Sequence, residues 1–245
     1  EGLVVYERWS QILSELEEVD ACMALRRAAP TGTLRLTAPL SFGQRHVLPL
    51  LDGFLKQWPE LRADIWFTDR FVDLIDEGID VAIRIGGLKD DSRILTRTIG
   101  WQQFATCASP DYLARRGVPQ APQDLAGHDT MLFMGGQRPS PWRLQTLQGL
   151  ALHEGPGRLH IDSSEALRAA ALSGFGLIHL PTYIIGEDLR SGRLVAVLAD
   201  CRPPPDAIRV IYPSRRHLSP RTRAVIDLLV ERWRDGVPWE AGSAA

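Results

Sequence analysis

The chain has 245 residues, enough for one large domain or two small ones. Hydrophobic residues make up 44% and charged residues 24% of it, an ordinary globular composition that excludes a disordered or collagen-like chain. The formal net charge of -2 excludes a basic protein that coats nucleic acid, although it leaves open a DNA-binding molecule whose basic part lies elsewhere.

The first 30 residues are typical of one long helix. Residues 3–29 contain neither Gly nor Pro, and apolar side chains recur at alternating steps of four and three. These heptad residues are Val5, Trp9, Ile12, Leu16, Val19 and Met23. Two interpretations remain open: an amphipathic helix packed on its own domain, or a helix that pairs with a second copy and makes a dimer or tetramer. The acid-rich start has no initiator Met, so we expect the natural chain to begin upstream.

Strands and helices alternate in residues 31–85. Leu34, Leu36 and Ala38 alternate with polar residues as a strand, and Ser41 is placed to cap a helix that runs to Trp58 with a break near Leu48. Further strands are expected at 63–67 and 81–85, with a short helix at 71–77 stopped by a glycine. This β-α-β-α-β order predicts a parallel sheet.

A second α/β unit follows a strand-like stretch at 94–108. Helix starts are expected at Ser109-Pro110 and at Ser163 or Ser164, and another helix at 183–189. Short strands are expected at 131–134, 142–144, 159–161, 177–181 and 194–198. A proline-rich crossing at 203–205 then leads to a strand at 208–212 and to a final helix that opens at Ser219.

Several motifs, in order along residues 32–235, resemble the effector-binding domain of LysR-type transcriptional regulators. They are Gly32-Thr33-Leu34-Arg35-Leu36-Thr37-Ala38-Pro39-Leu40-Ser41-Phe42-Gly43, Leu48-Pro49-Leu50-Leu51, Trp58-Pro59, Asp73-Leu74-Ile75-Asp76-Glu77-Gly78-Ile79-Asp80-Val81-Ala82-Ile83-Arg84, Ala108-Ser109-Pro110-Asp111-Tyr112-Leu113 and Gly174-Phe175-Gly176-Leu177. The resemblance is specific because these motifs agree in order, whereas no single one would suffice.

The resemblance implies an α/β fold of two Rossmann-like subdomains joined by two crossing strands, the type II architecture of periplasmic binding proteins, preceded by a long linker helix. It places a linker and dimerisation helix at 1–30, subdomain I at 31–102 and 206–245, and subdomain II at 103–205. It implies a small-molecule effector in the cleft and an upstream winged helix-turn-helix. That DNA-binding part is absent from this chain, so the chain alone is not expected to bind an operator. RNA polymerase is a further possible partner of the whole regulator.

Candidate effector-binding residues in the first unit follow its strands, where ligands gather in open α/β sheets. Ser41 and the free N–H groups of the next helix are suited to hold a carboxylate, although a plain N-cap is the alternative. Phe42 faces either the cleft or the core. Thr68 ends the second strand on the same side. Arg84, inside a buried strand, either pairs with Asp69, Asp73 or Asp80 or binds an anionic effector through its planar guanidinium.

In the second unit, Ser163 and Ser164 repeat the strand-to-helix arrangement of Ser41. Two such helix starts across one cleft would clamp an anion from both sides, so a small anionic effector is expected. Phe133 is a candidate for an apolar wall of the cleft, although aromatic residues are more often core residues.

Other chemistry finds little support in the sequence. It contains no GxSxG, HExxH, GxxxxGK[ST] or GxGxxG and no nucleophile–base spacing, so we expect no enzyme. The six histidines lack ligand spacing, and we expect no metal and no cofactor. The cysteines, Cys22, Cys107 and Cys201, form no CxxC, and no apolar run is long enough to span a membrane. A reducing, cytoplasmic location is therefore expected.

Two other functions are alternatives to the regulator. The main alternative is a solute-binding receptor of a transporter, and the second is an enzyme on the same fold.

Overall fold

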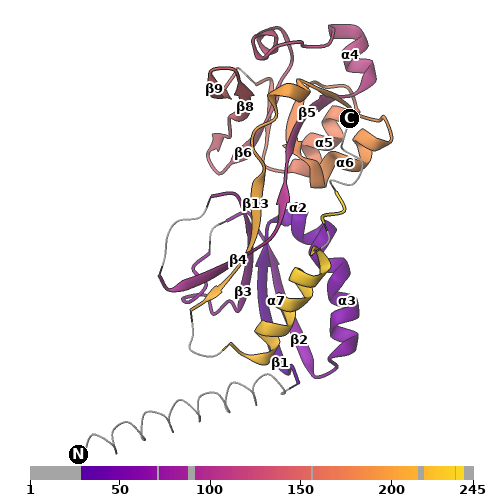
Figure 1. Cartoon of the computed structure of the whole chain (residues 1–245). Helices are drawn as coiled ribbons and strands as arrows, with labels where there is room; N and C mark the ends of the chain where they lie inside the picture. Colours follow the sequence, from indigo (N-terminus) through magenta and orange to yellow (C-terminus); the bar gives the residue numbers. More distant parts are fainter. Residues whose placement is uncertain are drawn as a thin grey trace, which may run out of the picture.

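The structure is a computed structural model that describes residues 29–70, 72–87, 92–155, 157–214, 218–234 and 236–239. The heptad residues Val5 to Met23 lie outside the described residues. Two lobes follow one another along the long axis of the molecule, and the strands β4 (Ile94–Gln102) and β13 (Asp206–Pro213) run from one towards the other (Figure 1). We call the lobe that contains residue 31 the first lobe and the lobe that contains residue 131 the second lobe.

The first lobe is built on a five-stranded sheet of order β2-β1-β3-β13-β4, in which β1 is Gly32–Ala38, β2 is Leu61–Phe67 and β3 is Val81–Ile85. β1 is parallel to both β2 and β3, as the alternating pattern predicted. β13 inserts antiparallel between β3 and β4, so a segment from near the end of the chain completes a sheet begun at residue 32.

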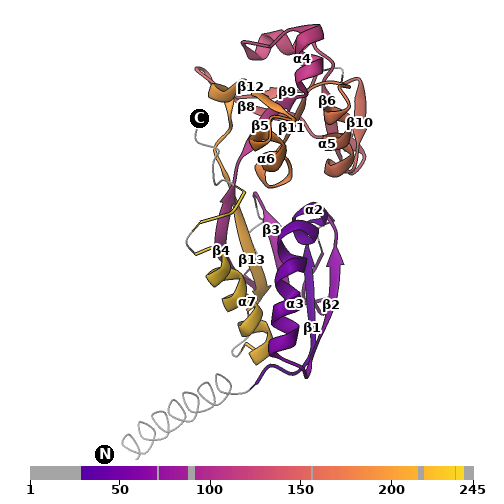
Figure 2. The ribbon, with the colours of Figure 1, turned by 90° about the vertical axis from the view of Figure 1, so that its right-hand side faces the viewer.

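Helices pack against this sheet (Figure 2). They are α2 (Leu40–Phe42), a wide π-helical turn η1 (Gly43–Val47), α3 (Leu48–Gln57) and α7 (Pro220–Arg232). The break expected near Leu48 is instead this wide turn, which continues directly into α3. Because Pro49 has no N–H to donate to the preceding turn, a local change in helical spacing accommodates it.

The short helix expected at 71–77 is not formed over the described residues 72–77, which was a wrong prediction. The chain makes tight turns there, because the Asp73 carboxylate accepts hydrogen bonds from the backbone N–H groups of Ile75 (2.9 Å) and Asp76 (3.1 Å). Such local side-chain bonds compete with the helical ladder. Gly78 then takes a positive φ of 64° and ends the turn.

The second lobe contains short strands in three groups. The antiparallel order β11-β5-β12 joins Ile178–Pro181, Phe104–Ala108 and Val195–Val197. The order β10-β6-β7 joins Leu159–Ile161, Met131–Gly135 and Arg138–Pro139, and a parallel bridge between Thr130 and Leu177 sets β6 beside β11. β8 (Trp142–Thr146) and β9 (Gly149–His153) form a hairpin.

The helices of the second lobe are α4 (Pro110–Arg116), α5 (Ser164–Leu172) and α6 (Thr182–Arg190), with short 3₁₀ turns at Pro122–Gly127 and Ala199–Cys201. Ser109, Ser163 and Ser219 cap α4, α5 and α7, and each hydroxyl accepts an N–H three residues on. The helix starts expected at Ser109 and Ser219 are therefore confirmed, and Ser163 rather than Ser164 caps α5.

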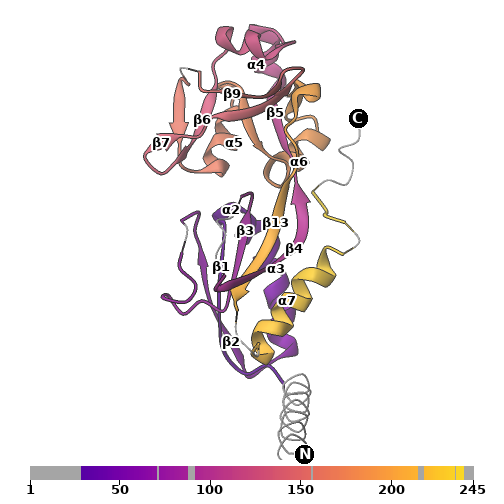
Figure 3. The same ribbon diagram turned by 60° about the vertical axis from the view of Figure 1, so that its left-hand side comes forward.

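Each lobe has its own apolar core, and the joint between them is narrow. The chain crosses at 102–104, between β4 and β5, and at 202–206, before β13 (Figure 3). Beside these crossings, Arg45 of η1 forms a two-pronged ion pair with Glu165 of α5, with N–O distances of 2.6 and 2.8 Å. His46 Nε2 donates to the Tyr183 carbonyl at 3.2 Å, so the two lobes also touch through side chains.

Candidate functional site

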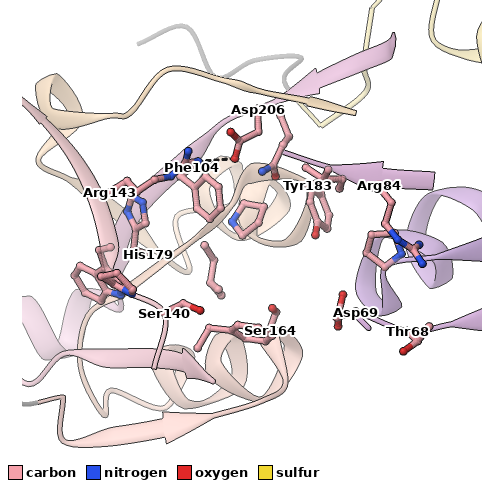
Figure 4. Close-up of a pocket in the computed structure, with 18 residues that line it drawn as sticks. Thr68, Asp69, Arg84, Phe104, Ser140, Arg143, Ser164, His179, Tyr183 and Asp206 are labelled. Carbon is pink, nitrogen blue, oxygen red and sulfur yellow. Dashed lines mark hydrogen bonds and ion pairs between the residues drawn. The ribbon is translucent and has the colours of Figure 1, made fainter. Parts of the chain in front are cut away.

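A cavity of about 370 Å³ lies at the joint and takes its walls from both lobes (Figure 4). That volume suits a small metabolite. The residues that line it are Pro39, Thr68, Asp69, Arg84, Ile85, Gln102, Phe104, Phe133, Ser140, Pro141, Trp142, Arg143, Ser164, His179, Leu180, Pro181, Tyr183 and Asp206. Figure 4 shows Thr68, Asp69 and Arg84 at one end, which we call the charged end, and Ser140, His179 and Arg143 towards the other, the aromatic end.

Arg84 dominates the charged end. Its side chain is held by Nη1, which donates to the Ile83 carbonyl at 2.7 Å. Nη2 donates weakly to the Thr37 hydroxyl (3.4 Å) and the Arg70 carbonyl (3.3 Å). Nε–H and one Nη1–H have no acceptor among the described residues, so the guanidinium retains donors for a ligand. Burial lowers the pKa of Arg84, and the nearby Asp69 charge opposes that shift.

Arg84 forms no ion pair with a carboxylate of the described residues, which contradicts the pairing interpretation. Asp73 pairs with Arg93 at 3.3 Å, and Asp80 pairs with Arg221 at 3.2 Å. Of the three carboxylates considered as partners of Arg84, Asp73 and Asp80 therefore bind other guanidinium groups.

Asp69 lies beside Arg84 without contacting it. Its carboxylate accepts a long 3.4 Å hydrogen bond from the Leu40 N–H and pairs with no cation of the described residues. Burial raises the pKa of Asp69, while that hydrogen bond and the charge of Arg84 act in the opposite direction. The charged end thus presents two opposite charges that do not neutralise each other by contact.

His179 of β11 is the central residue of the aromatic end. Its ring is stacked between Phe104, with centroids 5.0 Å apart, and Trp142, at 5.7 Å. These two aromatic contacts help to bury the ring, which is 8% exposed. Nδ1 lies 2.9 Å from the Thr106 hydroxyl, while Nε2 is buried with no partner.

The environment of His179 keeps its ring neutral. Burial, together with the charge of Arg143, lowers its pKa from 6.5 to about 3. In the neutral ring Nε2 is a donor if the Thr106 hydroxyl donates to Nδ1, and an acceptor if that bond runs the other way. His179 therefore contributes an uncharged ring to the wall of the cavity, and its Nε2 is buried beside it without a partner.

Gln102 adds a second uncharged polar group at the end of β4. The side chain is only 2% exposed, and its Oε1 is buried with no hydrogen-bond partner. Since a buried amide without a partner costs about 1–3 kcal/mol, this arrangement is unfavourable unless something else binds there.

Arg143 and Asp206 are already paired with each other. Arg143 Nη2 donates to the Asp206 carboxylate, and the guanidinium also lies over the Phe104 ring, 5.6 Å from its centroid. This pair joins β8 of the second lobe to the start of β13. It leaves no net formal charge on the aromatic end, where His179 is also neutral.

Of the predicted site residues, Thr68, Arg84, Phe133 and Ser164 line the cavity, whereas Ser41, Phe42 and Ser163 do not. Ser163 is instead engaged as the N-cap of α5, with its hydroxyl 3.3 Å from the Ala166 nitrogen. Its neighbour Ser164 lies between the two ends of the cavity in Figure 4.

The expected capping role of Ser41 was wrong, and of the two alternatives left open for Phe42 the structure shows the core. Pro39 takes the cap position of α2, with an extended ψ of 141°, so Ser41 is already inside the helix and caps nothing. Phe42 is 0% exposed and packs against the rings of Tyr183, Trp233 and Trp239. The helical spacing turns this side chain towards the core and away from the cavity.

The sequence interpretation missed most of the aromatic end. Gln102, Phe104, Arg143, His179 and Tyr183 come from five different elements, and no local pattern connects them. One signal was present: Gln102 and Arg143 are polar residues inside strand-like stretches, and such residues need partners when buried.

The neutral state of His179 predicts a pH dependence of stability. Because the folded protein binds this proton less readily than the unfolded chain, the stabilising contribution is complete above about pH 6.5 and is lost as the pH falls towards 3. We expect His179→Phe, which keeps the aromatic stack, to flatten the acid side of the stability profile by up to about 1.4 kcal/mol per pH unit. Urea unfolding between pH 7 and pH 4 measures this slope. The exposed His160→Gln serves as control, and parallel slopes for wild type and His179→Phe would contradict the prediction.

The fold and the site together define a class: a two-lobed α/β domain that encloses a small-molecule cavity at the joint of its lobes. Comparison with known proteins agrees. Residues 27–234 match the family model of the LysR substrate binding domain. The chain belongs to the LysR family of transcriptional regulators, and these residues are its substrate-binding domain, with the type II fold of periplasmic binding proteins.

Relatives of known name are regulators. The chain is 34% identical over 239 residues to the HTH-type transcriptional regulator YhjC of Escherichia coli K12, covering 97% of this chain and 78% of the relative. It is 31% identical over 232 residues to the HTH-type regulator PtxR of Pseudomonas aeruginosa, covering 94% and 73%. These matches support a regulator over a transporter receptor.

Solved structures show the same fold. The structure of CrgA, a LysR-type transcriptional regulator from Neisseria meningitidis, superposes with a TM-score of 0.76 at 28% identity, covering 95% of this chain and 79% of that one. The full-length virulence activator AphB from Vibrio cholerae gives a TM-score of 0.74 at 26% identity, covering 94% and 78%. Within the described part of this chain, no helix is long and apolar enough to cross a membrane.

Proposed function

We propose that this domain senses a small metabolite that carries a carboxylate or another anionic group, and that the cavity between the lobes is its binding site. The observation that supports this most directly is Arg84, which lines the cavity and has two N–H donors without an acceptor among the described residues. In two other lining residues, Oε1 of Gln102 and Nε2 of His179 are buried without partners. A bound effector that contacts them would recover the free energy that their burial costs.

The expected consequence of binding is a population shift. An effector that contacts both lobes favours an arrangement that holds them together, as the Arg45–Glu165 ion pair also does. In the full regulator, that geometry would pass through a linker helix at 1–30 to the DNA-binding heads of a homo-oligomer. Equal affinity of the full-length protein for the effector with and without operator DNA would refute this coupling, because allosteric coupling is reciprocal.

The same proposal divides the chain into subdomain I, 31–102 with 206–245, and subdomain II, 103–205. Separate apolar cores in the two lobes support this division. It also assigns the domain a role in recognition without catalysis and a cytoplasmic location, where a regulator meets DNA and RNA polymerase. The regulators among its relatives support both parts.

A thermal-shift screen of metabolites tests the binding site. A binder at about 100 times its dissociation constant is expected to add about 2.7 kcal/mol of apparent stability. Arg84→Gln should abolish the shift, because it removes the cationic donors of the charged end. The exposed Lys56→Gln, on α3 and outside the cavity, should leave the shift unchanged. Hits that bind a folded Arg84→Gln variant as tightly as the wild type would place the site elsewhere.

A further inference from the structure

The residues that line the cavity indicate a more specific class of ligand than a simple anion, and this inference rests on the proposed function. Its four charged lining groups are Asp69, Arg84, Arg143 and Asp206, which sum to a formal charge of zero. Arg143 and Asp206 neutralise each other in contact. Asp69 and Arg84 do not, and neither forms an ion pair with any other described residue.

A purely anionic ligand suits this arrangement poorly. An anion close to Arg84 would also lie close to the carboxylate of Asp69, and this repulsion is strong in a partly buried site. A ligand with both charges would satisfy Arg84 with its anionic group and Asp69 with its cationic group. Figure 4 shows the two side chains at the same end of the cavity, so both charges have to lie at one end of the ligand.

The aromatic end selects the other part of the ligand. A charged group there would lose its hydration without meeting an unpaired counter-ion, because Asp206 already holds Arg143 and His179 is neutral. An apolar group would leave the buried Nε2 of His179 and Oε1 of Gln102 without partners. An uncharged group that forms hydrogen bonds avoids both costs.

We propose that the effector is a small zwitterion, an α-amino acid or a close analogue of one. Its carboxylate binds Arg84 and its ammonium group binds Asp69. Its side chain ends in an uncharged polar group that reaches Gln102 and His179.

Calorimetry on the 245-residue chain tests this with L-amino acids that have uncharged polar side chains. Each is compared with the same acid without its amino group, as in L-glutamine and glutaramate. L-glutamate and L-norvaline complete the set, since they place a charge or a methyl group at the far end. We expect a polar zwitterion to bind at least about tenfold more tightly than its three counterparts.

Asp69→Asn is the most informative variant, because it should change the affinities of the two ligands in opposite directions. It should weaken binding of the zwitterion by roughly 10- to 100-fold, because the ammonium group loses its partner. It should strengthen binding of the acid without the amino group, because a repelling charge is removed. Asp52→Asn, an exposed residue of α3, is the matched control and should change neither affinity.

The outcomes separate this inference from the proposed function. Simple acids that bind as tightly as the zwitterions in an Arg84-dependent manner, with no reversal in Asp69→Asn, would overturn the zwitterion and leave the sensing cavity intact. Binding that Arg84→Gln does not affect would overturn both. If none of the polar amino acids binds the wild type, the named class is wrong, and the metabolite screen alone decides the proposed function.

Discussion

Phe42→Ala is expected to destabilise the protein by about 3–5 kcal/mol, since the ring is fully buried and its loss leaves a cavity in the core. Around it, centroids of His46 (5.4 Å), Tyr183 (5.3 Å), Trp233 (5.6 Å) and Trp239 (5.5 Å) complete an aromatic cluster. Tyr183 belongs to the second lobe and lines the cavity, so this cluster also helps to hold the two lobes together.

Equilibrium unfolding in urea measures the effect. Phe175→Ala is the matched control: this ring is 61% exposed, and its removal should change the free energy of unfolding by no more than about 0.5 kcal/mol. A ring that served only as a wall for the effector would behave differently, because its truncation would lower affinity and leave stability almost unchanged. A loss below about 1 kcal/mol for Phe42→Ala would therefore contradict its place in the core.

Gly176→Ala is expected to cost about 3 kcal/mol for a steric reason. A Cβ on Gly176 would lie 2.1 Å from the carbonyl oxygen of Asp129, which is backbone and cannot move aside as a side-chain tip does. That carbonyl accepts the N–H of Leu177 at 2.9 Å, so the two segments are held in close approach. Within the motif Gly174-Phe175-Gly176, Gly176 therefore lies at a position that has no room for a side chain.

The matched control for this substitution is expected to change the free energy of unfolding in the opposite direction. Gly53 lies inside α3 with no atom within 4 Å of an added Cβ, so Gly53→Ala should stabilise the protein by about 0.5–1 kcal/mol. Because β11 begins two residues after Gly176 and carries His179, we also expect Gly176→Ala to weaken effector binding. Equal stability of Gly176→Ala and wild type would show that the strand can shift without cost.

Much of the fold could be read from local patterns. Alternation of apolar residues located β1 and β2, because a strand with one buried face has a strict period of two, and a nearly continuous apolar run located the buried strand β3. The serine caps at Ser109 and Ser219 were predictable, because a cap is a hydrogen bond within a few residues. The ordered family motifs then supplied the arrangement of the lobes, which periodicity by itself does not contain.

The candidate site was predictable only in part. Thr68 follows β2, Arg84 lies near the end of β3 and Ser164 begins α5, and the topology of α/β sheets brings such positions to a cleft. The cap expected at Ser41 was wrong because Pro39 places the helix start two residues earlier, and Phe42, which was open between cleft and core, lies in the core.

The sequence by itself determined the order of the elements, most of their limits and the family to which the chain belongs, since each depends on short-range patterns or on ordered motifs. Only the tertiary structure decided that Asp69 stays apart from Arg84 and that Arg143 is neutralised by Asp206, 63 residues further along the chain. The stacking that buries and neutralises His179 was decided in the same way. The charge distribution in the cavity therefore depends on which distant segments of the chain meet, and the packing of the two lobes determines which segments do.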